Sequence, residues 1–368
     1  MQAPWIIISF EDSLEGHYNF GKEIGTKLKQ WIKHAFDNDI ELSKMEKFVK
    51  DCPNIFNNFV NESTNAFPLY TKEIEGMAVG AEQPLERMFI NQLREELAQW
   101  IYDDLPRVGH CSTTFSYDLK NKISILAQND DWTQNYRKES YCIFATVLEP
   151  NSDKVKYKFI SWSYPGFLPG SDLNVNSYGV AFTCNSLFPK KFLDHGIGTA
   201  WIIRNSLTSK DINELIKKAS NSLVSTAISY NIGNLTTGEL YNLEVNTGGL
   251  SSLQTIDNIY FHGNLFIHTD IEQYEYEPTT IAHNIWLKDK PKTFDEIKTF
   301  MSTPELFRDN EDSCGVYTEV TGIFNFIDNT LSIWTGSLSN SKSPSIILSI
   351  KQDTFGEILI NNDGINFI

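Results

Sequence analysis

The spacing of apolar residues along the chain changes near residue 110. Before this point, apolar side chains return at helical intervals, as Met88, Leu93, Leu97 and Ile101 do within the segment 84–102. Helices are therefore expected over residues 18–36, 44–64, 68–81 and 84–102. The apolar start of the chain soon meets acidic residues and has no basic segment ahead of it, so it predicts a strand and not a secretory signal.

From residue 111 onward, short runs alternate apolar and polar side chains, as half-buried antiparallel strands do. Strands are expected at 111–117, 123–128, 140–149, 155–163, 179–185, 226–232, 240–245, 259–261, 321–326, 331–334 and 345–350. Helical patterns near 199–207, 211–219 and 293–301 interrupt them. A strand-rich sequence with helices at its start and middle predicts stacked layers of helices and sheets around a shared core.

The first two of these strands predict a β-hairpin, because the polar segment 118–122 joins them. Such a hairpin returns the chain to its starting edge, so we expect Asp131 beside Cys111. A thiol becomes a good nucleophile only as a thiolate, which requires a nearby base or cation. An α-amine created by cleavage before Cys111 would supply such a base, with a pKa of about 7.7–8.0 in peptides. A cysteine at a strand start is more often a buried structural residue.

Composition narrows the classes of function. Hydrophobic residues make up 41% and aromatic residues 13% of the 368 residues, enough to build a large core. No apolar run approaches the roughly eighteen residues of a membrane span, so no membrane partner is expected. The net charge of −16 repels phosphate backbones, which argues against nucleic acid as a partner.

The cysteines and histidines predict no cofactor and no metal. Five cysteines, Cys314 among them, show no repeated spacing, so neither a zinc site nor a disulfide framework is indicated, and a cytoplasmic location fits best. His262 and His268 could form a metal pair, but the sequence offers them no convincing third ligand.

Several motifs occur in a characteristic order along most of the chain. They are Gly16–Gly25, Gly76–Ala81, Phe89–Glu96, Gly109–Cys111, Leu173–Asn185 and His262–Phe266. In order and spacing they resemble the isopenicillin N acyltransferase (peptidase C45-like) family of N-terminal-nucleophile amidohydrolases. The resemblance implies an α+β fold, a four-layer αββα sandwich. It also implies self-cleavage between His110 and Cys111, which would divide one structural domain into a helical segment, 1–110, and a segment 111–368.

The same resemblance implies the catalytic residues. Cys111 would be the nucleophile, its own α-amine the base, and Asp131 the group that orients this amine. Asn264 would donate to the oxyanion, although Gly263 stands where the family usually has Thr. Asn185 matches a family Asn at a strand end. Asn264 as an ordinary turn residue and Asn185 as a strand cap remain open alternatives.

Pocket residues follow from the aromatic segments. Trp132, Tyr164 and Phe167 are candidates for pocket walls, because ligand sites are mostly apolar. Packing between layers is an equally open role for the aromatic loop 162–170. The family carries an Arg before its late strand, whereas residues 314–319 contain none. Arg308 could replace it from a shifted loop, either by stabilising Asp131 or by binding an anionic part of the substrate.

The leading interpretation is a self-processing cysteine amidohydrolase that acts on a small N-acyl amine or N-acyl amino acid. An acyl-CoA-dependent amine N-acyltransferase is the nearest alternative, since both reactions use one acyl-cysteine. A papain-like pair of Cys111 with His262 and a non-catalytic binding protein on the same fold are the others. Expected partners are a small-molecule amide and the two fragments of the precursor, with a homodimer of these fragments as one possible assembly.

Overall fold

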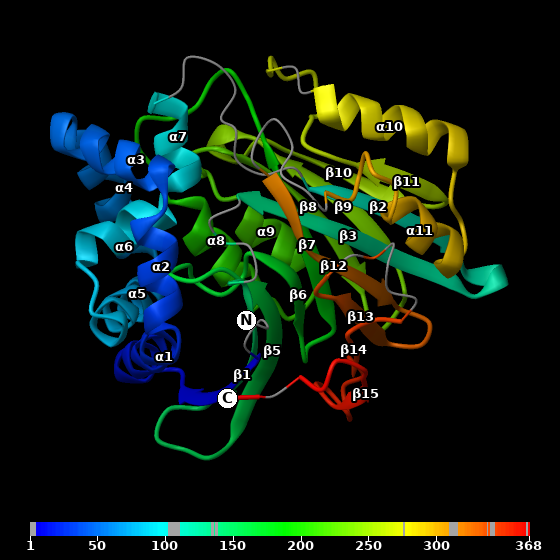
Figure 1. Cartoon of the computed structure of the whole chain (residues 1–368), viewed down its shortest axis with the longest axis horizontal. Coiled ribbons are helices and arrows are strands. Elements are labelled where there is room, and N and C mark those ends of the chain that lie inside the picture. The colour runs from blue at the N-terminus through cyan, green and yellow to red at the C-terminus, as the bar shows by residue number, and fades with distance from the viewer. Residues whose placement is uncertain are drawn as a thin grey trace.

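The computed structural model describes residues 5–101, 111–133, 136, 139–274, 277–308, 316–336, 338, 343–365 and 367–368. His110, on the expected cleavage junction, and Cys314 lie outside these residues. Two β-sheets lie face to face in the middle of the molecule, and helices cover the outer side of each sheet (Figure 1).

The first sheet has eight strands within the described residues, in the order β1-β4-β5-β6-β7-β8-β9-β10. The bounds are β1 Trp5–Glu11, β4 Tyr141–Leu148, β5 Val155–Ser163, β6 Asp172–Asn176, β7 Val180–Leu187, β8 Ala227–Asn234, β9 Leu240–Val245 and β10 Ser251–Ile256. β1 runs parallel to β4, and the other neighbouring pairs are antiparallel. Because β1 comes from the N-terminal segment, both predicted segments contribute strands to this sheet.

The second sheet has seven strands in the described part of the chain, in the order β11-β2-β3-β12-β13-β14-β15. The bounds are β2 Ser112–Asp118, β3 Ile123–Thr133, β11 Ile259–His262, β12 Val316–Asn325, β13 Thr330–Trp334, β14 Ile346–Ser349 and β15 Ile358–Asn361. β2 and β3 form the expected hairpin around a short 3-10 turn at Leu119–Asn121. β3, however, continues as a strand beyond the predicted end at residue 128.

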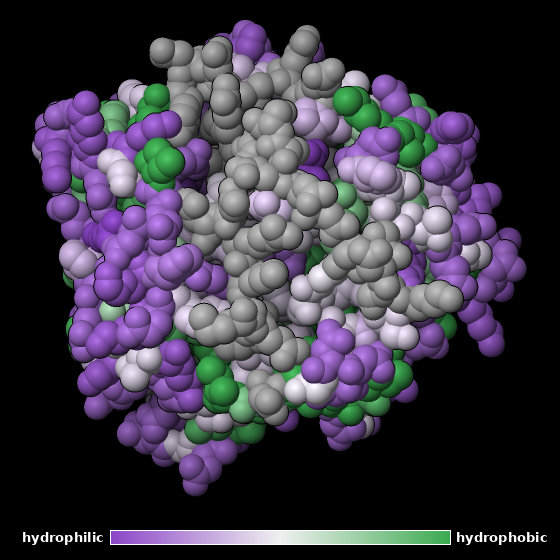
Figure 2. Space-filling view, viewed as in Figure 1, coloured by the Kyte–Doolittle hydropathy of each residue, from purple (hydrophilic) through white to green (hydrophobic). Residues whose placement is uncertain are grey.

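Helices α1–α9 lie beside the first sheet, and α10 and α11 lie against the second (Figure 1). Their bounds are α1 Leu14–Lys27, α2 Lys29–Asp37, α3 Ile40–Asp51, α4 Pro53–Ala66, α5 Pro68–Ala81, α6 Leu85–Gln92, α7 Arg94–Ile101, α8 Thr199–Ser206, α9 Ile212–Ala219, α10 Glu277–Asp289 and α11 Phe294–Met301. On the face in Figure 2, the N-terminal helices at the left carry mainly hydrophilic residues. No helix of the described ranges combines the length and apolar character needed to cross a membrane.

Three clusters of buried hydrophobic residues fill the three spaces between these four layers. One joins the N-terminal helices to the first sheet and includes Phe36 and Phe159. The second lies between the sheets, where Phe115 of β2 and Trp162 of β5 belong to one cluster. The third, which includes Phe300 of α11, joins the last helices to the second sheet. The predicted α+β class and four-layer αββα sandwich are confirmed.

The close packing of helices α1 and α5 explains two of the glycine-containing motifs. A Cβ on Gly21 of α1 would lie 1.9 Å from the Glu73 carbonyl oxygen of α5, and one on Gly76 would lie 2.0 Å from the Tyr18 carbonyl oxygen. Glycine therefore lets the backbones of α1 and α5 touch. The buried Arg204 of α8 donates to both carboxylate oxygens of Glu73, at 3.0 and 2.7 Å. This bidentate pair ties the N-terminal helices to the later part of the chain.

Candidate active site

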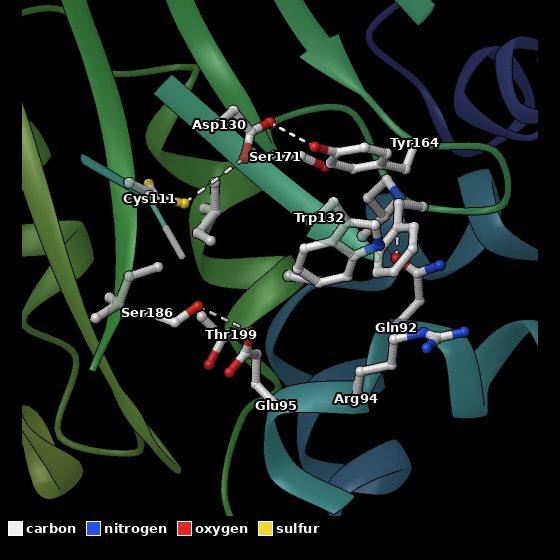
Figure 3. Close-up of a pocket in the computed structure, with 17 residues that line it drawn as sticks. Gln92, Arg94, Glu95, Cys111, Asp130, Trp132, Tyr164, Ser171, Ser186 and Thr199 are labelled. Carbon is white, nitrogen blue, oxygen red and sulfur yellow. Dashed lines mark hydrogen bonds between the residues drawn. The ribbon is translucent and has the colours of Figure 1, made fainter. Parts of the chain in front are cut away.

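The register of the β2–β3 hairpin sets the position of the candidate nucleophile. Ser112 pairs with Asn129 and Thr113 with Gln128, so one further step places Cys111 opposite Asp130. Directly opposed residues of an antiparallel pair share one face of the sheet. The Cys111 Sγ accordingly donates to Asp130 Oδ1 at 3.7 Å (Figure 3).

Asp131 does not face the thiol, contrary to the expectation that its side chain lies beside Cys111. Because β3 remains a strand through Thr133, its side chains alternate between the two faces of the sheet. Asp130 points into the space between the sheets, whereas Asp131 points to the opposite face. There Asp131 Oδ1 accepts a hydrogen bond from the Thr318 hydroxyl at 2.6 Å, and Arg308 Nε lies 3.3 Å from Asp131 Oδ2.

Arg308 therefore stands in one of the two positions considered for it, next to Asp131. Thr318 fixes this arrangement by accepting a hydrogen bond from the Arg308 backbone N–H at 2.9 Å. Burial raises the pKa of Asp131 to about 7, against the opposing effect of the Arg308 charge. Arg308 does not line the pocket beside Cys111.

The thiol lies in an acidic environment. Burial raises the pKa of Cys111 well above its usual value, and the carboxyl groups of Asp130 and Asp172 raise it further. Burial also raises the pKa of Asp130 to about 6, although hydrogen bonds from the Tyr164 hydroxyl, at 2.7 Å, and from Cys111 lower it. In the intact chain, therefore, the thiol stays protonated at neutral pH and requires a base before it can attack.

A pocket with about 740 Å³ of empty space, counting the part open to solvent, adjoins Cys111. It is lined by Gln92, Arg94, Glu95, Cys111, Asp130, Trp132, Tyr164, Phe167, Leu168, Gly170, Ser171, Cys184, Ser186, Thr199, Ala200, Ile203 and Ile228. The rings of Trp132 and Tyr164 stack with centroids 5.2 Å apart, and Phe167 meets Trp132 edge-on. Trp132 and Tyr164 lie on the side of the pocket opposite the thiol (Figure 3), and Phe167, the third residue expected in the wall, packs against both rings.

Helix α6 holds the aromatic loop in place. The Gln92 side chain accepts a hydrogen bond from the Leu168 N–H at 2.9 Å and donates to the Gly166 carbonyl oxygen. Gly166 has φ of +85°, in the left-handed region, and a Cβ there would lie 2.7 Å from the Phe36 ring. Only glycine fits this turn beneath the aromatic wall.

Glu95 is a pocket residue that sequence reasoning did not single out. It is partly exposed, points toward the side of the pocket that holds Ser186 (Figure 3), and accepts a hydrogen bond from the Ser186 hydroxyl at 3.0 Å. Burial and the neighbouring Glu96 raise the pKa of Glu95 to about 7. Both acids occur in the motif Phe89–Glu96, but only the packing of α7 decides which one faces the pocket.

The two candidate oxyanion donors lie near the pocket but not among its lining residues. Asn185 Oδ1 accepts a hydrogen bond from the Thr113 hydroxyl at 3.0 Å, while its buried Nδ2 has no hydrogen-bond partner within the described part of the chain. Asn264 Nδ2 donates to the carbonyl oxygen of Ser186, a pocket residue, at 3.0 Å. Asn185 therefore has a free amide donor, whereas the donor of Asn264 is at least partly engaged.

The hydrogen bonds of His262 do not involve the Cys111 thiol. Its Nε2 bonds Glu244 Oε1 at 3.0 Å, and its Nδ1 bonds the Gly263 carbonyl oxygen at 2.8 Å. Glu244 and His268 lie close enough to His262 to suggest a metal site. Glu244 Oε1, however, already accepts from the N–H groups of Ile267 and His268. This cluster shapes the loop that carries Asn264, and a Cys111–His262 pair gains no support.

Comparison with known proteins identifies the family. Residues 119–339, more than half of the chain, match the sequence model of the family described as acyl-coenzyme A:6-aminopenicillanic acid acyl-transferase. The chain belongs to this family. The resemblance drawn from the sequence motifs is thereby confirmed. Because the match begins after Cys111, it leaves the role of this residue as a prediction.

One curated relative is an animal enzyme. Over 223 residues, the chain is 24% identical to the β-alanyl-dopamine/carcinine hydrolase of Drosophila melanogaster. The match covers 57% of this chain and 57% of that relative. The chain therefore spans little more than half the length of the curated relative.

Solved structures show weaker likenesses. One is a Caenorhabditis elegans N-acylethanolamine-hydrolyzing acid amidase ortholog, with a TM-score of 0.43, 10% identity, and coverage of 59% of this chain and 93% of that one. Another is penicillin V acylase from Agrobacterium tumefaciens, with a TM-score of 0.41, 10% identity, and coverage of 66% and 89%. The assignment of the fold rests on the chain's own sheets, helices and cores.

One departure from the family pattern has a local cause. Gly263 stands where the family usually has Thr, and a Cβ on Gly263 would lie 2.5 Å from Thr279 Cγ2. The Thr279 hydroxyl accepts the backbone N–H of Asn264 at 3.0 Å. Thr279 of α10 therefore occupies the space of a residue-263 side chain and fixes the Asn264 backbone in its place.

Proposed function

We propose that this chain is a self-processing cysteine amidohydrolase that cleaves small N-acyl amines through an acyl-cysteine intermediate. The observation that carries the proposal is the contact between Cys111 and Asp130 at the start of β2, beside a mostly apolar pocket. Membership of the acyl-transferase family supports an acyl-group chemistry for this site.

The proposed maturation is an attack of the Cys111 thiol on the carbonyl carbon of His110. The His110–Cys111 peptide bond breaks, its nitrogen takes the proton that the thiol gives up, and a thioester joins the two residues. Water then hydrolyses the thioester, which leaves a carboxylate on His110 and a free thiol and α-ammonium on Cys111. The fragments stay associated, because β1 pairs with β4 and Arg204 binds Glu73 across the junction. A homodimer of this pair remains a prediction.

In the mature enzyme, the α-amine of Cys111 removes the thiol proton, and the thiolate attacks the substrate carbonyl. Asp130 orients the resulting ammonium, since its carboxylate already meets the Cys111 side chain. The unpartnered Nδ2 of Asn185 and the amide of Asn264 donate to the oxyanion. The ammonium then protonates the leaving amine, and water resolves the acyl-cysteine.

The pocket favours a substrate with an amine over one with a carboxylate. Its lining joins the stacked Trp132 and Tyr164 to the partly buried carboxyl of Glu95. The guanidinium of Arg94 is paired with Asp39, so its charge is already balanced. The Drosophila relative is described as acting on β-alanyl-dopamine and carcinine, which supports N-acyl amines as the class.

Acyl transfer to an amine is the second candidate, favoured by the description of the family as an acyl-transferase. Both reactions share the acyl-cysteine and differ only in the nucleophile that resolves it. We also propose a cytoplasmic location, where the free thiols of Cys111, Cys142 and Cys184 stay reduced.

The experiment that tests the proposal compares wild type with Cys111→Ala on a panel of N-acyl amines, with products separated by chromatography. Release of the free amine by the wild type and none by the variant is the expected result. Addition of a second amine as acceptor distinguishes the candidates, because a transferase forms a new amide whereas a hydrolase forms only the acid. Equal turnover by wild type and Cys111→Ala would exclude the proposed nucleophile.

A further inference from the structure

Two carboxyl groups, one from each sheet, converge on the thiol of Cys111. One ligand atom each from Cys111, Asp130 and Asp172 lies within 4.8 Å of the other two. Asp130 belongs to β3 of the second sheet, and Asp172 begins β6 of the first. The exposed fractions are 7% for Cys111, 4% for Asp130 and 1% for Asp172. The sandwich therefore encloses two acids next to the nucleophile.

These acids lack a positive partner in the described residues. No ion pair joins a lysine, arginine or histidine of the described ranges to Asp130 or Asp172. Asp172 Oδ1 accepts the Leu173 N–H at 2.7 Å, and the other donors that face Asp172 within the described residues, the Cys184 backbone and the Gln128 amide, are neutral. A buried carboxylate without a cation is unfavourable, so this corner of the site lacks one positive charge.

Cleavage before Cys111 creates a positive charge at this place. The new α-ammonium is attached to the Cα of Cys111, two bonds from the Cβ that carries the sulfur. We propose that Asp172 acts together with Asp130 to hold this ammonium, so that Asp172 is a positioning residue for the base. The inference rests on the proposed function, and it assigns a role to an acid that the family resemblance does not include.

Two carboxylates around one ammonium favour its charged form and raise its pKa. The neutral amine that acts as base therefore forms only at higher pH. The other groups that face Asp172 are the thiol of Cys111, the backbone of Cys184 and the side-chain amide of Gln128, none of them cationic. Loss of the Asp172 charge should therefore make the amine deprotonate at lower pH.

The test uses Asp172→Asn, which keeps the size of the side chain and an oxygen for the Leu173 N–H. Asp153→Asn, on an exposed turn, is the matched control. In the cleaved enzyme, the ascending limb of kcat/KM against pH should move to lower pH by about one to three units in Asp172→Asn, and stay in place in the control. A limb that does not move overturns the inference.

Thermal melting at pH 8 provides a readout that does not depend on activity. In an uncleaved Cys111→Ala chain, Asp172→Asn should raise Tm, because burial raises the pKa of the Asp172 carboxyl and so disfavours the folded state at pH 8, a cost that the amide does not incur. In the cleaved enzyme the same change should lower Tm, because it removes a partner of the ammonium. A change of the same sign in both backgrounds would contradict the inference.

Two further outcomes separate the possible failures. A wild-type chain that never cleaves overturns both this inference and the proposed maturation, because the ammonium then never forms. A chain that cleaves and turns over substrate, but whose Asp172→Asn variant is unchanged in both readouts, overturns the inference alone. Stoichiometric divalent metal in the cleaved enzyme, detected by elemental analysis, would assign the two acids to a metal ion and also overturn it.

Discussion

Replacing Asp130 and Asp131 with asparagine, one at a time, should separate their roles. Asp130 meets the Cys111 thiol, whereas Asp131 meets Thr318 and Arg308 on the opposite face of β3. We expect Asp130→Asn to reduce kcat/KM strongly and Asp131→Asn to affect it much less. The two variants differ by one position in sequence and are chemically identical changes, so each is the control for the other.

The magnitudes follow from the surroundings of each carboxyl. An opposite charge within about 4–6 Å changes a pKa by about 1–3 units, and each unit corresponds to about 1.4 kcal/mol. Loss of the Asp130 charge removes this stabilisation from the ammonium that forms when the amine takes the thiol proton, so kcat/KM at pH 8 should fall by about 10- to 1000-fold. Asp131 faces Thr318 and Arg308 and not the thiol, so its exchange leaves the charge beside the α-ammonium in place, and the expected loss is less than about tenfold.

The assay is kcat/KM at pH 8 on purified, fully cleaved enzyme, with Tm measured on the same samples. Similar Tm values would show that differences in turnover do not arise from unfolding. The reasoning would be refuted if Asp131→Asn abolished turnover at an unchanged Tm while Asp130→Asn remained active. That result would mean that Asp131 turns toward Cys111 in the mature enzyme.

Three further expectations concern substrate and base. Glu95→Gln should lower kcat/KM about tenfold or more for substrates that carry a free amino group, because these substrates lose an ionic partner. Turnover of uncharged analogues should stay within about twofold. Equal effects on both substrates in a paired kinetic assay would contradict this expectation. N-acyl amines should be turned over better than N-acyl amino acids with the same acyl group, since Arg308 is engaged by Asp131, and a preference for the carboxylate that disappears in Arg308→Ala would show the opposite. His262→Gln should lower Tm through the loss of the Glu244 contact yet retain considerable turnover, whereas loss of activity at an unchanged Tm would restore the Cys–His alternative.

Sequence patterns predicted the hairpin that carries the nucleophile but not the orientation of its acids. The segment after residue 128 is polar, which is typical of a loop, yet β3 continues to Thr133. Its polar side chains are buried because tertiary partners satisfy them: Asn129, for example, donates to the carbonyl oxygens of Met301 and Leu306 at 2.9 and 3.0 Å. Such long-range partners leave no local signal, so strand alternation was missed and Asp131 was expected where Asp130 lies.

Strand β6 was missed for the same reason. Its polar residues give no alternation of apolar side chains, yet Asn174 donates to the Gly170 carbonyl oxygen at 2.8 Å, and Asn176 to that of Leu207 at 3.0 Å. Asp172 is buried at the start of this strand, so no pattern could place it beside Cys111. The predicted helices 18–36, 44–64 and 84–102 are each two helices, which meet at Leu28, at Cys52 and near Leu93. Helical periodicity locates such segments but does not reveal a change of axis.

Intact mass under denaturing conditions, combined with N-terminal sequencing, tests the central claim most directly. Active protein should separate into two fragments of about 110 and 258 residues, the longer one beginning at Cys111, whereas the Cys111→Ala chain should remain a single species of 42.0 kDa. Under native conditions the two fragments should elute together. An active preparation that shows only the full-length mass, and only the N-terminus of the uncleaved chain, would contradict self-processing. It would also exclude the α-amine of Cys111 as the base.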